Sequence, residues 1–271
     1  EPMKPELHNI GFTDYQAINA LNFSTAKNIK KCARSLNHAG DMEATTAMVL
    51  GTAVHTAILE PIAFKKWYKR APENARRGSK AWKEVADKFP RSTILRWNEY
   101  QEVIAMRDSL SENADAVSIL EGGYTEASIT WTDEKSRLDL KCRIDKCLMN
   151  DDDALIVDLK TTQDASPRAM AYRMVTEPYY YLLQMAWYQR GFEAVFEVKP
   201  RVAIVAIEKS AGYPTAVYDI ADADMELANQ DVDIMLEKVV EAKKEGGAGH
   251  YPRTFLELPD WYYNIKEEVT I

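Results

Sequence analysis

Two carboxylates and an ammonium group are the side chains of this sequence best suited to chemistry. Residues 137–160 read RLDLKCRIDKCLMNDDDALIVDLK, which indicates a strand, an acidic turn and a second strand. An antiparallel hairpin would bring Asp145 next to Asp158 and Lys160. Converging carboxylates suit Mg²⁺, a hard cation that prefers oxygen ligands, and a nearby ammonium can offset the charge of a phosphate. The hairpin therefore predicts a metal site for phosphate chemistry.

Side-chain alternation indicates which of these groups share a face. Because successive strand residues point to opposite faces, Asp158 and Lys160 lie on the same one. The first strand alternates an apolar set with a charged set: Leu138, Leu140, Cys142 and Ile144 against Asp139, Lys141, Arg143 and Asp145. We expect residues 150–153 to form the turn and to stay outside the site. An Asp-x-Lys pair alone is weak support for a catalytic site, because such pairs are often solvent-exposed ion pairs.

The elements that would position these groups form a mixed α/β pattern. Period-two alternation continues from Tyr124 through the hairpin, so we expect three successive strands. The remaining elements are predicted helices at 24–36 (capped by Ser24), 43–59, 80–89 (capped by Ser79), 96–110, 166–191 (interrupted at Pro178) and 222–244, and strands at 201–208 and 215–220. The fold class predicted is α/β, with a central mixed sheet flanked by helices and a helical N-terminal region.

Length and composition favour one elaborated domain. The chain has 271 residues, 46% of them hydrophobic, and no low-complexity linker. We divide it into a mainly helical region (1–120), an α/β core (121–245) and an aromatic tail (246–271), and expect a fragment of a longer protein because it begins at Glu1. No apolar run approaches the roughly 18 residues that a membrane helix needs. Three cysteines fit a reducing, intracellular compartment and are too few for an all-cysteine iron–sulfur cluster.

The charge of the chain is unevenly distributed. The net charge is −8, yet residues 1–110 carry 17 basic against 12 acidic residues. Residues 64–96 hold eleven basic against three acidic side chains, enough to attract a polyanion. From this segment we predict DNA contacts by Lys65, Lys66, Lys69, Arg70, Arg76, Arg77 and Lys80. The alternative is a helical face that is merely solvated.

Four sequence segments together resemble a known nuclease family. Asp145 followed by Asp158-Leu159-Lys160 resembles the motif of the PD-(D/E)xK nuclease superfamily, with Asp in the middle position. The segment from Gly51 through His55 to Glu60 is similar to the upstream helix motif of its RecB-like branch, and Gln184-x-x-x-Tyr188 is similar to the downstream motif. These segments occur in the family's order, and the wider sequence resembles nuclease domains of the RecE type.

The resemblance implies an activity and a set of ligands. It implies a Mg²⁺-dependent 5′-to-3′ exodeoxyribonuclease that degrades double-stranded DNA and leaves 3′ single-stranded overhangs for recombination. It implies one or two Mg²⁺ ions, with Mn²⁺ as a substitute, held by His55, Asp145, Asp158 and the backbone carbonyl of Leu159, with Lys160 catalytic. DNA contacts are expected from Gln184, Tyr188 and Thr161. No ATP is expected, because the sequence contains no phosphate-binding loop of the G-x-x-x-x-G-K-[ST] type.

The resemblance also implies partners and a location. These are the ends of double-stranded DNA, a single-strand annealing protein of the RecT type, and further copies of the chain in a ring, a tetramer. We expect a cytoplasmic protein, bacterial or prophage-encoded, with no membrane association.

Several alternatives remain open from the residues themselves. His55 could be a structural histidine in an apolar helix, and Gln184 and Tyr188 could simply pack together, because they are four residues apart on one helix face. The alternative activities are an endonuclease on the same fold and a non-catalytic DNA-binding module.

Overall fold

The three strands predicted between residues 124 and 160 form the centre of the sheet. The computed structural model describes residues 2–38, 45–90, 92–150, 153–251 and 253–258. Its strands are β1 Glu6–His8, β2 Leu21–Asn22, β3 Tyr68–Arg70, β4 Thr93–Leu95, β5 Tyr124–Thr132, β6 Asp139–Met149, β7 Ala154–Thr162, β8 Arg201–Glu208 and β9 Thr215–Ile220. Its helices are α1 Phe12–Ala17, α2 Phe23–Ala26, the 3₁₀ helix η1 Lys27–Lys30, α3 Ala33–Asn37, α4 Thr46–Leu59, α5 Pro61–Trp67, α6 Lys80–Lys88, α7 Trp97–Ser111, α8 Ala114–Leu120, α9 Pro167–Val175, α10 Tyr181–Phe196 and α11 Asp222–Lys244.

The main sheet mixes antiparallel and parallel pairing. Its seven strands follow the order β1-β5-β6-β7-β8-β9, with β2 pairing beside β6. β7 and β8 are parallel, and α9 and α10 connect them, as a crossover connection requires. The other neighbours along this order are antiparallel, and β3 and β4 form a separate parallel pair. The predicted α/β class with a central mixed sheet is therefore confirmed.

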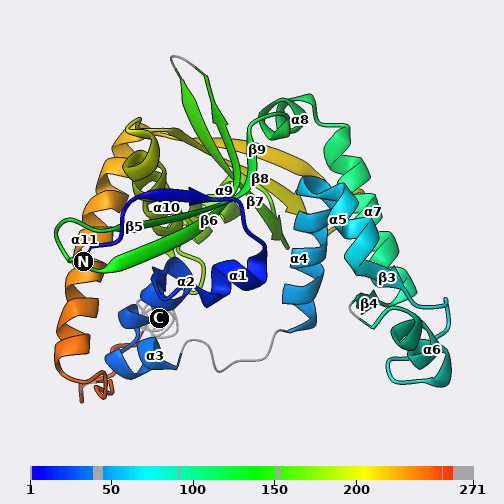
Figure 1. Ribbon diagram of the computed structural model, residues 1–271, viewed down its shortest axis with the longest axis horizontal. Helices are drawn as coiled ribbons and strands as arrows, with labels where there is room; N and C mark the ends of the chain where they lie inside the picture. The colour runs from blue at the N-terminus through cyan, green and yellow to red at the C-terminus, as the bar shows by residue number, and fades with distance from the viewer. Residues whose placement is uncertain (1, 39–44, 91, 151–152, 252, 259–271) are drawn as a thin grey trace, which may run out of the picture.

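Helices cover both faces of this sheet (Figure 1). On one face α10 and α11 pack over a core that includes Trp187, Phe192 and Ile204. On the other face α4 and α7 pack over a second core that includes Val54, Met106 and Val205. β8 contributes to both cores in alternation, which explains its nearly continuous apolar sequence.

The helix caps confirm one prediction and correct another. Ser79 caps α6 by accepting a hydrogen bond from the Trp82 amide, as predicted. Ser24 does not cap a helix through residue 36: Asn22 accepts from the Thr25 amide, and the stretch divides into α2, η1 and α3. α4 begins at Thr46, capped by Thr45, and Glu43 of the predicted helix lies outside the described residues.

Gly191 was predicted to end a helix, and that prediction is wrong. The interruption near Pro178 is real, since α9 ends at Val175 and α10 begins at Tyr181. α10 then continues through Gly191 to Phe196. A Cβ atom at Gly191 would lie 2.8 Å from Trp131 and 2.9 Å from Cys142. The glycine is there because α10 approaches β5 and β6 closely, not because the helix stops.

The N-terminal region contains strands that the sequence did not predict. β1 pairs with β5, and β2 pairs with β6. Between them, the buried Lys141 ammonium donates to the carbonyls of Tyr15, Gln16 and Ile18. Short strands of three and two residues carry too little alternation to be recognised, so the sequence indicated helix alone here.

The remaining predicted elements agree closely with the structure. β8, β9 and α11 have the predicted bounds, and α7 extends one residue beyond the predicted end at residue 110. Among the described residues, no helix combines the length and apolarity needed to cross a bilayer. Asp151 and Asp152 of the predicted turn, and Trp261, Tyr262 and Tyr263 of the predicted aromatic tail, lie outside the described residues.

Candidate active site

The hairpin register brings the predicted carboxylates to the end of one ladder. β6 and β7 pair regularly from Met149 and Ala154 up to Lys146 and Val157, so Asp145 and Asp158 come next on the two strands. There the ladder changes: the Leu159 amide donates to the Asp145 carboxylate, with N and Oδ2 2.8 Å apart. Regular pairing thus gives way to a side-chain contact at the predicted site.

The side-chain alternation shifts at the same place. Leu140, Cys142 and Ile144 belong to the core beneath α10, as predicted, but so does Cys147. Lys141 and Arg143 reach the N-terminal segment, whereas Asp145 contacts His55 and Leu159. The predicted single charged face from 139 to 145 is therefore divided between two surroundings. Strict alternation could not show this shift.

A chain of polar contacts runs from the second carboxylate to α10. The Lys160 ammonium lies 2.5 Å from Asp158 Oδ2 and donates to Gln184 Oε1 at 2.9 Å. The Gln184 amide in turn donates to the Tyr188 hydroxyl at 2.7 Å. Residues from β7 and α10 are thereby joined. Gln184 and Tyr188 do share a helix face, and that face meets Lys160.

His55 reaches the first carboxylate from α4. Its Nδ1 lies 3.4 Å from Asp145 Oδ2. α4 lies beside β7 here: a Cβ atom at Gly51 would be in ordinary contact with Thr161, 3.5 Å from its Oγ1. The structure thus gathers His55, Asp145, Asp158, Lys160, Gln184 and Tyr188 in one cluster, with Leu159 and Thr161 at its edge.

Burial and charge shift the ionisation of the cluster strongly. Burial and the neighbouring charge of Asp145 raise the pKa of Asp158 to about 6, against the opposing effect of Lys160. Burial would raise the pKa of Asp145 too, but His55, Lys160 and the Leu159 amide outweigh it and lower that pKa. The pKa values of His55 and Lys160 are both raised, because the carboxylates outweigh the effect of burial. Lys160 therefore carries its proton at neutral pH.

The donor set fits a divalent cation. Asp145 and Asp158 are both buried, and the Lys160 ammonium lies 2.5 Å from Asp158 Oδ2. Two buried carboxylates side by side are costly unless cations neutralise them, and Mg²⁺ prefers oxygen ligands of this kind. The described residues do not form a preassembled group of three or more His, Cys, Asp or Glu ligands. Asp145 and Asp158 are the residues that would hold the ion. The ligand role predicted for the Leu159 carbonyl stays a prediction.

The predicted basic residues lie in another part of the molecule. Lys65, Lys66 and Lys69 are on α5 and β3, and Figure 1 shows β3, β4 and α6 away from the main sheet. Arg77 makes two hydrogen bonds, of 2.8 and 3.0 Å, to the buried Glu99, and Arg70 lies 3.7 Å from the ring centroid of Trp97. These two arginines therefore have structural partners. Lys65, Lys66, Arg76 and Lys80 are exposed.

Glu126 is a half-buried carboxylate beside the cluster that the sequence did not indicate. It lies on β5 with a positive φ of 54°, an unusual conformation for a residue with a side chain. Arg143 donates to it at 2.5 Å. Burial and then the charge of Asp145 raise its pKa. A glutamate inside an alternating strand gives no sequence signal. The backbone conformation and the Arg143 contact reveal it.

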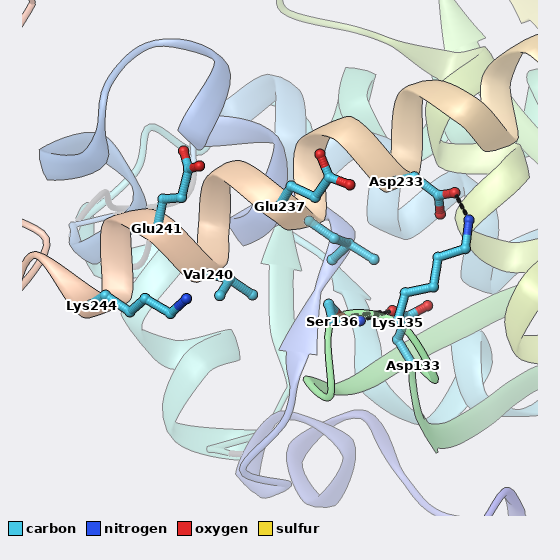
Figure 2. A pocket seen from close by; sticks show the side chains of 9 residues that line it. Asp133, Lys135, Ser136, Asp233, Glu237, Val240, Glu241 and Lys244 are labelled. Carbon is cyan, nitrogen blue, oxygen red and sulfur yellow. Dashed lines mark hydrogen bonds and ion pairs between the residues drawn. The ribbon is translucent and has the colours of Figure 1, made fainter.

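A separate hollow lies away from these residues. It has a volume of about 280 Å³ and lies between α11 and the turn that joins β5 to β6 (Figure 2). Its lining includes Lys135, Asp233, Glu237 and Lys244. None of the predicted site residues lines it.

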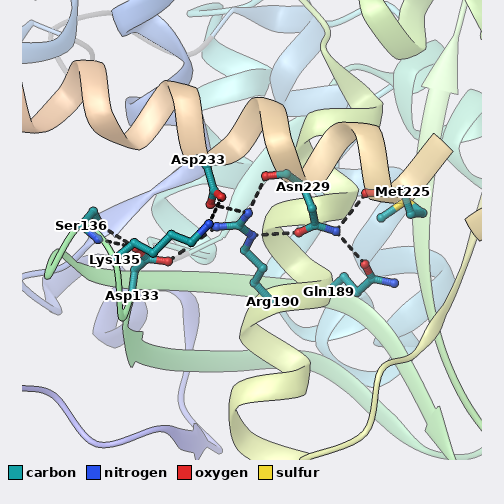
Figure 3. A network of polar contacts seen from close by, with 8 residues as sticks. All are labelled: Asp133, Lys135, Ser136, Gln189, Arg190, Met225, Asn229 and Asp233. Atoms are coloured by element: carbon teal, nitrogen blue, oxygen red, sulfur yellow. Dashed lines mark hydrogen bonds and ion pairs between the residues drawn. The ribbon is translucent and has the colours of Figure 1, made fainter. Parts of the chain in front are cut away.

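A polar network beside this hollow has a structural role (Figure 3). Arg190 on α10 lies 2.7 Å from Asp233 and donates at 2.8 Å to Asn229, both on α11. The same guanidinium lies 3.6 Å from Asp133 in the β5–β6 turn. Asn229 also donates to Gln189 at 3.0 Å. The network joins the turn, α10 and α11.

The fold and the cluster together define a nuclease-like protein of the PD-(D/E)xK class. Two carboxylates and a lysine lie on adjacent strands of a mixed sheet, and a histidine and a Gln-x-x-x-Tyr pair approach from helices on its two faces. The chain belongs to the family described as "PDDEXK-like domain of unknown function (DUF3799)", whose model matches residues 22–251. The predicted membership of the PD-(D/E)xK superfamily is confirmed.

Solved structures agree with this fold. The chain is similar to a protein from Eubacterium rectale described as a candidate exonuclease, with a TM-score of 0.63 and 12% identity over 95% of this chain and 98% of that one. It is weakly similar to SSO0001 (TM-score 0.27, 13% identity, 79% of this chain and 84% of that one) and to VC1899 from Vibrio cholerae (TM-score 0.28, 8% identity, 91% and 60%). These two similarities are too weak to support a conclusion about this chain. No curated protein matches the chain.

Proposed function

We propose that this protein is a divalent-cation-dependent exodeoxyribonuclease that digests double-stranded DNA from its ends. The observation that supports this best is the pair of buried carboxylates, Asp145 and Asp158, on neighbouring strands beside the Lys160 ammonium. A nuclease family and an exonuclease-like fold make phosphodiester hydrolysis the natural use of this arrangement.

Each residue has a distinct part in the proposed reaction. Asp145 and Asp158 would hold Mg²⁺, or Mn²⁺ in its place, with the Leu159 carbonyl and His55 as further ligands. When bound, the ion supplies Lewis acidity that activates water and offsets phosphate charge. Lys160 acts as a cation, and in the protein without metal the charges of Asp158 and Asp145 raise its pKa. It orients the attacking water and stabilises the negative charge of the transition state.

The residues from α10 position Lys160. Gln184 accepts one of its hydrogen bonds, and Tyr188 accepts a hydrogen bond from Gln184. These two hydrogen bonds restrict the Lys160 ammonium to the space beside Asp158. We propose that Gln184, Tyr188 and Thr161 also contact the DNA backbone.

The finer features of the proposal rest on resemblance to exonuclease VIII (RecE). They are 5′-to-3′ polarity, a 3′ single-stranded product used in homologous recombination and repair, and a bacterial or prophage cytoplasmic setting. A RecT-type annealing partner and a tetrameric ring of this chain belong to the same proposal. The proposal also includes one or two Mg²⁺ ions per site and DNA contacts by the basic segment from Lys65 to Lys80.

A digestion time course tests the activity. Linear duplex DNA labelled at either the 5′ or the 3′ end is incubated with Mg²⁺, with Mn²⁺ or with chelator, using the wild-type chain and the Lys160→Ala variant. We expect early release of the 5′ label, only with metal and only from the wild type. Early release of the 3′ label would reverse the polarity. No metal-stimulated release would favour a non-catalytic DNA-binding module.

Circular duplex DNA separates the two enzyme classes. An enzyme that needs an end leaves a covalently closed circle intact, whereas an endonuclease linearises it. The control is the same circle cut once before incubation. Loss of the closed circle at the rate of the linear form would favour an endonuclease on this fold.

A further inference from the structure

Cationic and aromatic side chains border the candidate active site beside the start of α10. We call this group the lysine–tyrosine rim. It consists of Lys27, Lys30 and Lys31 at η1, Arg173 on α9, and Tyr179, Tyr180 and Tyr181. Lys30, Lys31 and Tyr179 are exposed, and Tyr179 retains 39% of its accessible surface. The rim therefore exposes both ammonium groups and an aromatic ring to solvent.

The rim begins at the proposed catalytic lysine. The Lys160 ammonium lies 4.6 Å from the centroid of the Tyr181 ring, and the rings of Tyr181 and Tyr179 are 5.4 Å apart. On the other side, the positive charge of Lys160 helps burial to lower the pKa of Lys27. The two tyrosine rings thus connect Lys160 with the exposed Tyr179.

Contacts between η1 and residues 177–181 hold the rim in place. Lys27 donates to the Pro178 carbonyl at 2.8 Å, Lys31 lies 3.2 Å from Glu177, and the Lys30 ammonium lies 5.0 Å from the Tyr180 ring centroid. Tyr180, between Tyr179 and Tyr181, has a positive φ of 51°, an unusual conformation for a residue with a side chain. Such a conformation persists only where the surroundings determine it.

The rim is a positive region on an acidic protein. Lys27, Lys30, Lys31 and Arg173 have two acidic residues near them, Glu177 and Asp164, whereas the whole chain carries a net charge of −8. The contacts between its cations and rings are individually weak at exposed positions. A phosphate can therefore replace them at little cost. Cations beside a carboxylate site suit a polyanion whose phosphate enters that site.

We propose that the lysine–tyrosine rim binds an unpaired strand of DNA as it enters or leaves the active site. Ammonium groups bind the phosphates, and the Tyr179 ring stacks on a base. An unpaired strand offers both partners at once, because base faces inside a duplex are already covered by their neighbours. The proposal rests on the nuclease function above, and it concerns the form of DNA that occupies this part of the site.

Equilibrium binding without metal tests the rim separately from catalysis. A fluorescein-labelled oligothymidylate and a blunt duplex of equal length are titrated in chelator, and binding is followed by anisotropy. The variants are Tyr179→Ala, Tyr179→Phe and Lys30→Ala/Lys31→Ala. The matched charge control is Lys199→Ala/Lys238→Ala, which removes two exposed lysines outside the rim. Thermal melting checks that each variant is folded.

The expected results distinguish stacking from charge. Tyr179→Ala should weaken oligothymidylate binding by about fivefold to a hundredfold, while Tyr179→Phe keeps most of it. Lys30→Ala/Lys31→Ala should lower the slope of log affinity against log salt by about 1.4, and the control should not. Unchanged single-strand affinity in the rim variants would show that the rim is packing. Equal losses on duplex and single strand would assign it to duplex DNA.

The experiments distinguish an error in the rim proposal from an error in the proposed nuclease function. If the wild type binds the oligothymidylate through the rim but never cleaves DNA with metal, the proposed function is wrong and the rim is a binding site only. If the wild type cleaves DNA and the rim variants bind like the wild type, the rim proposal alone is wrong.

Discussion

The carboxylate of Asp145 accepts a hydrogen bond from the backbone amide of Leu159, with the two atoms 2.8 Å apart. This bond lies one step beyond the last regular pair of β6 and β7, between Lys146 and Val157. Because Leu159 lies between Asp158 and Lys160 in sequence, one contact fixes Asp145 relative to both. The geometry of the site therefore depends on the register of the hairpin.

Replacing Asp145 with asparagine should separate its charge from its hydrogen bond. In the variant Asp145→Asn the side-chain amide oxygen can still accept from the Leu159 amide, so the hairpin should stay folded. The negative charge that helps to raise the pKa of His55 is lost, so that pKa should fall. NMR titration of the histidine ring, with His55→Gln to assign the signal, measures the change. An unchanged pKa would show that Asp145 does not determine the ionisation of His55. Metal-dependent cleavage should be lost in the same variant.

Lys160→Ala should slow cleavage by about 10²–10³ while leaving DNA affinity largely intact. The ammonium lies beside Asp158 and is held by Gln184, in position to stabilise transition-state charge rather than to bind substrate from a distance. Single-turnover cleavage and anisotropy in chelator measure the two effects. Lys209→Ala, just after the end of β8, is the matched control. Cleavage at the wild-type rate would remove Lys160 from the mechanism.

The protein without metal should be more stable at about pH 5 than at about pH 7. The pKa of Asp158 is about 6 in the folded state and 3.8 ordinarily, so the folded chain binds this proton more tightly and stability falls as pH rises between these values. His55 acts in the same direction: its raised pKa contributes stability that is present below about 6.5 and lost as pH rises through the folded value. Between about pH 5 and about pH 7, Asp158 alone accounts for about 1 kcal/mol of this difference.

Thermal melting in chelator measures this dependence. Asp158→Asn cannot take up the proton, so its melting temperature should vary less between these pH values. A saturating divalent cation should remove or reverse the wild-type trend, because ionised carboxylates are required to bind it. A melting temperature that rises with pH in chelator would contradict the expected cost of burying an ionised Asp158.

The cluster was predictable because its residues occur at spacings that secondary structure converts into proximity. Asp158 and Lys160 share a strand face, Asp145 follows from the hairpin register, and Gln184 and Tyr188 share a helix face. Glu126 was not predictable, since its place beside Asp145 depends on a local backbone conformation that its sequence does not favour. Side-chain alternation and helix periodicity act over a few residues. They were therefore sufficient to predict the cluster around the hairpin, but not the place of Glu126, where the alternation breaks.

The missed strands and the misread glycine have a common cause. β1 and β2 exist because β5 and β6 supply their partners from far along the chain. Gly191 is required by the rings and sulfur atom of two strands that pack against α10. Each depends on a tertiary contact, so neither propensity nor periodicity could indicate it.

Gly191→Ala should therefore destabilise the protein, although alanine is the better helix former. The added Cβ would lie 2.8 Å from Trp131 and 2.9 Å from Cys142, both buried, so the core must shift at a cost of about 1–3 kcal/mol. Gly51→Ala on α4 is the matched control, since its nearest neighbour would be 3.5 Å away. It should be neutral or gain up to about 1 kcal/mol. Urea denaturation measures both, and equal stability of the two variants would contradict the close approach of α10.

Lys65→Ala/Lys66→Ala should weaken duplex binding if the basic segment contacts phosphates. Both side chains are exposed, and neither forms an ion pair with a described residue, so their removal should not unfold the region. The slope of log affinity against log salt should fall by about 1.8 for two lost contacts. Arg77→Ala is a different case, because it leaves the buried Glu99 with one cation fewer and should lower the melting temperature as well. Lys199→Ala/Lys238→Ala controls for net charge. A slope equal to that of the wild type would assign Lys65 and Lys66 to solvent.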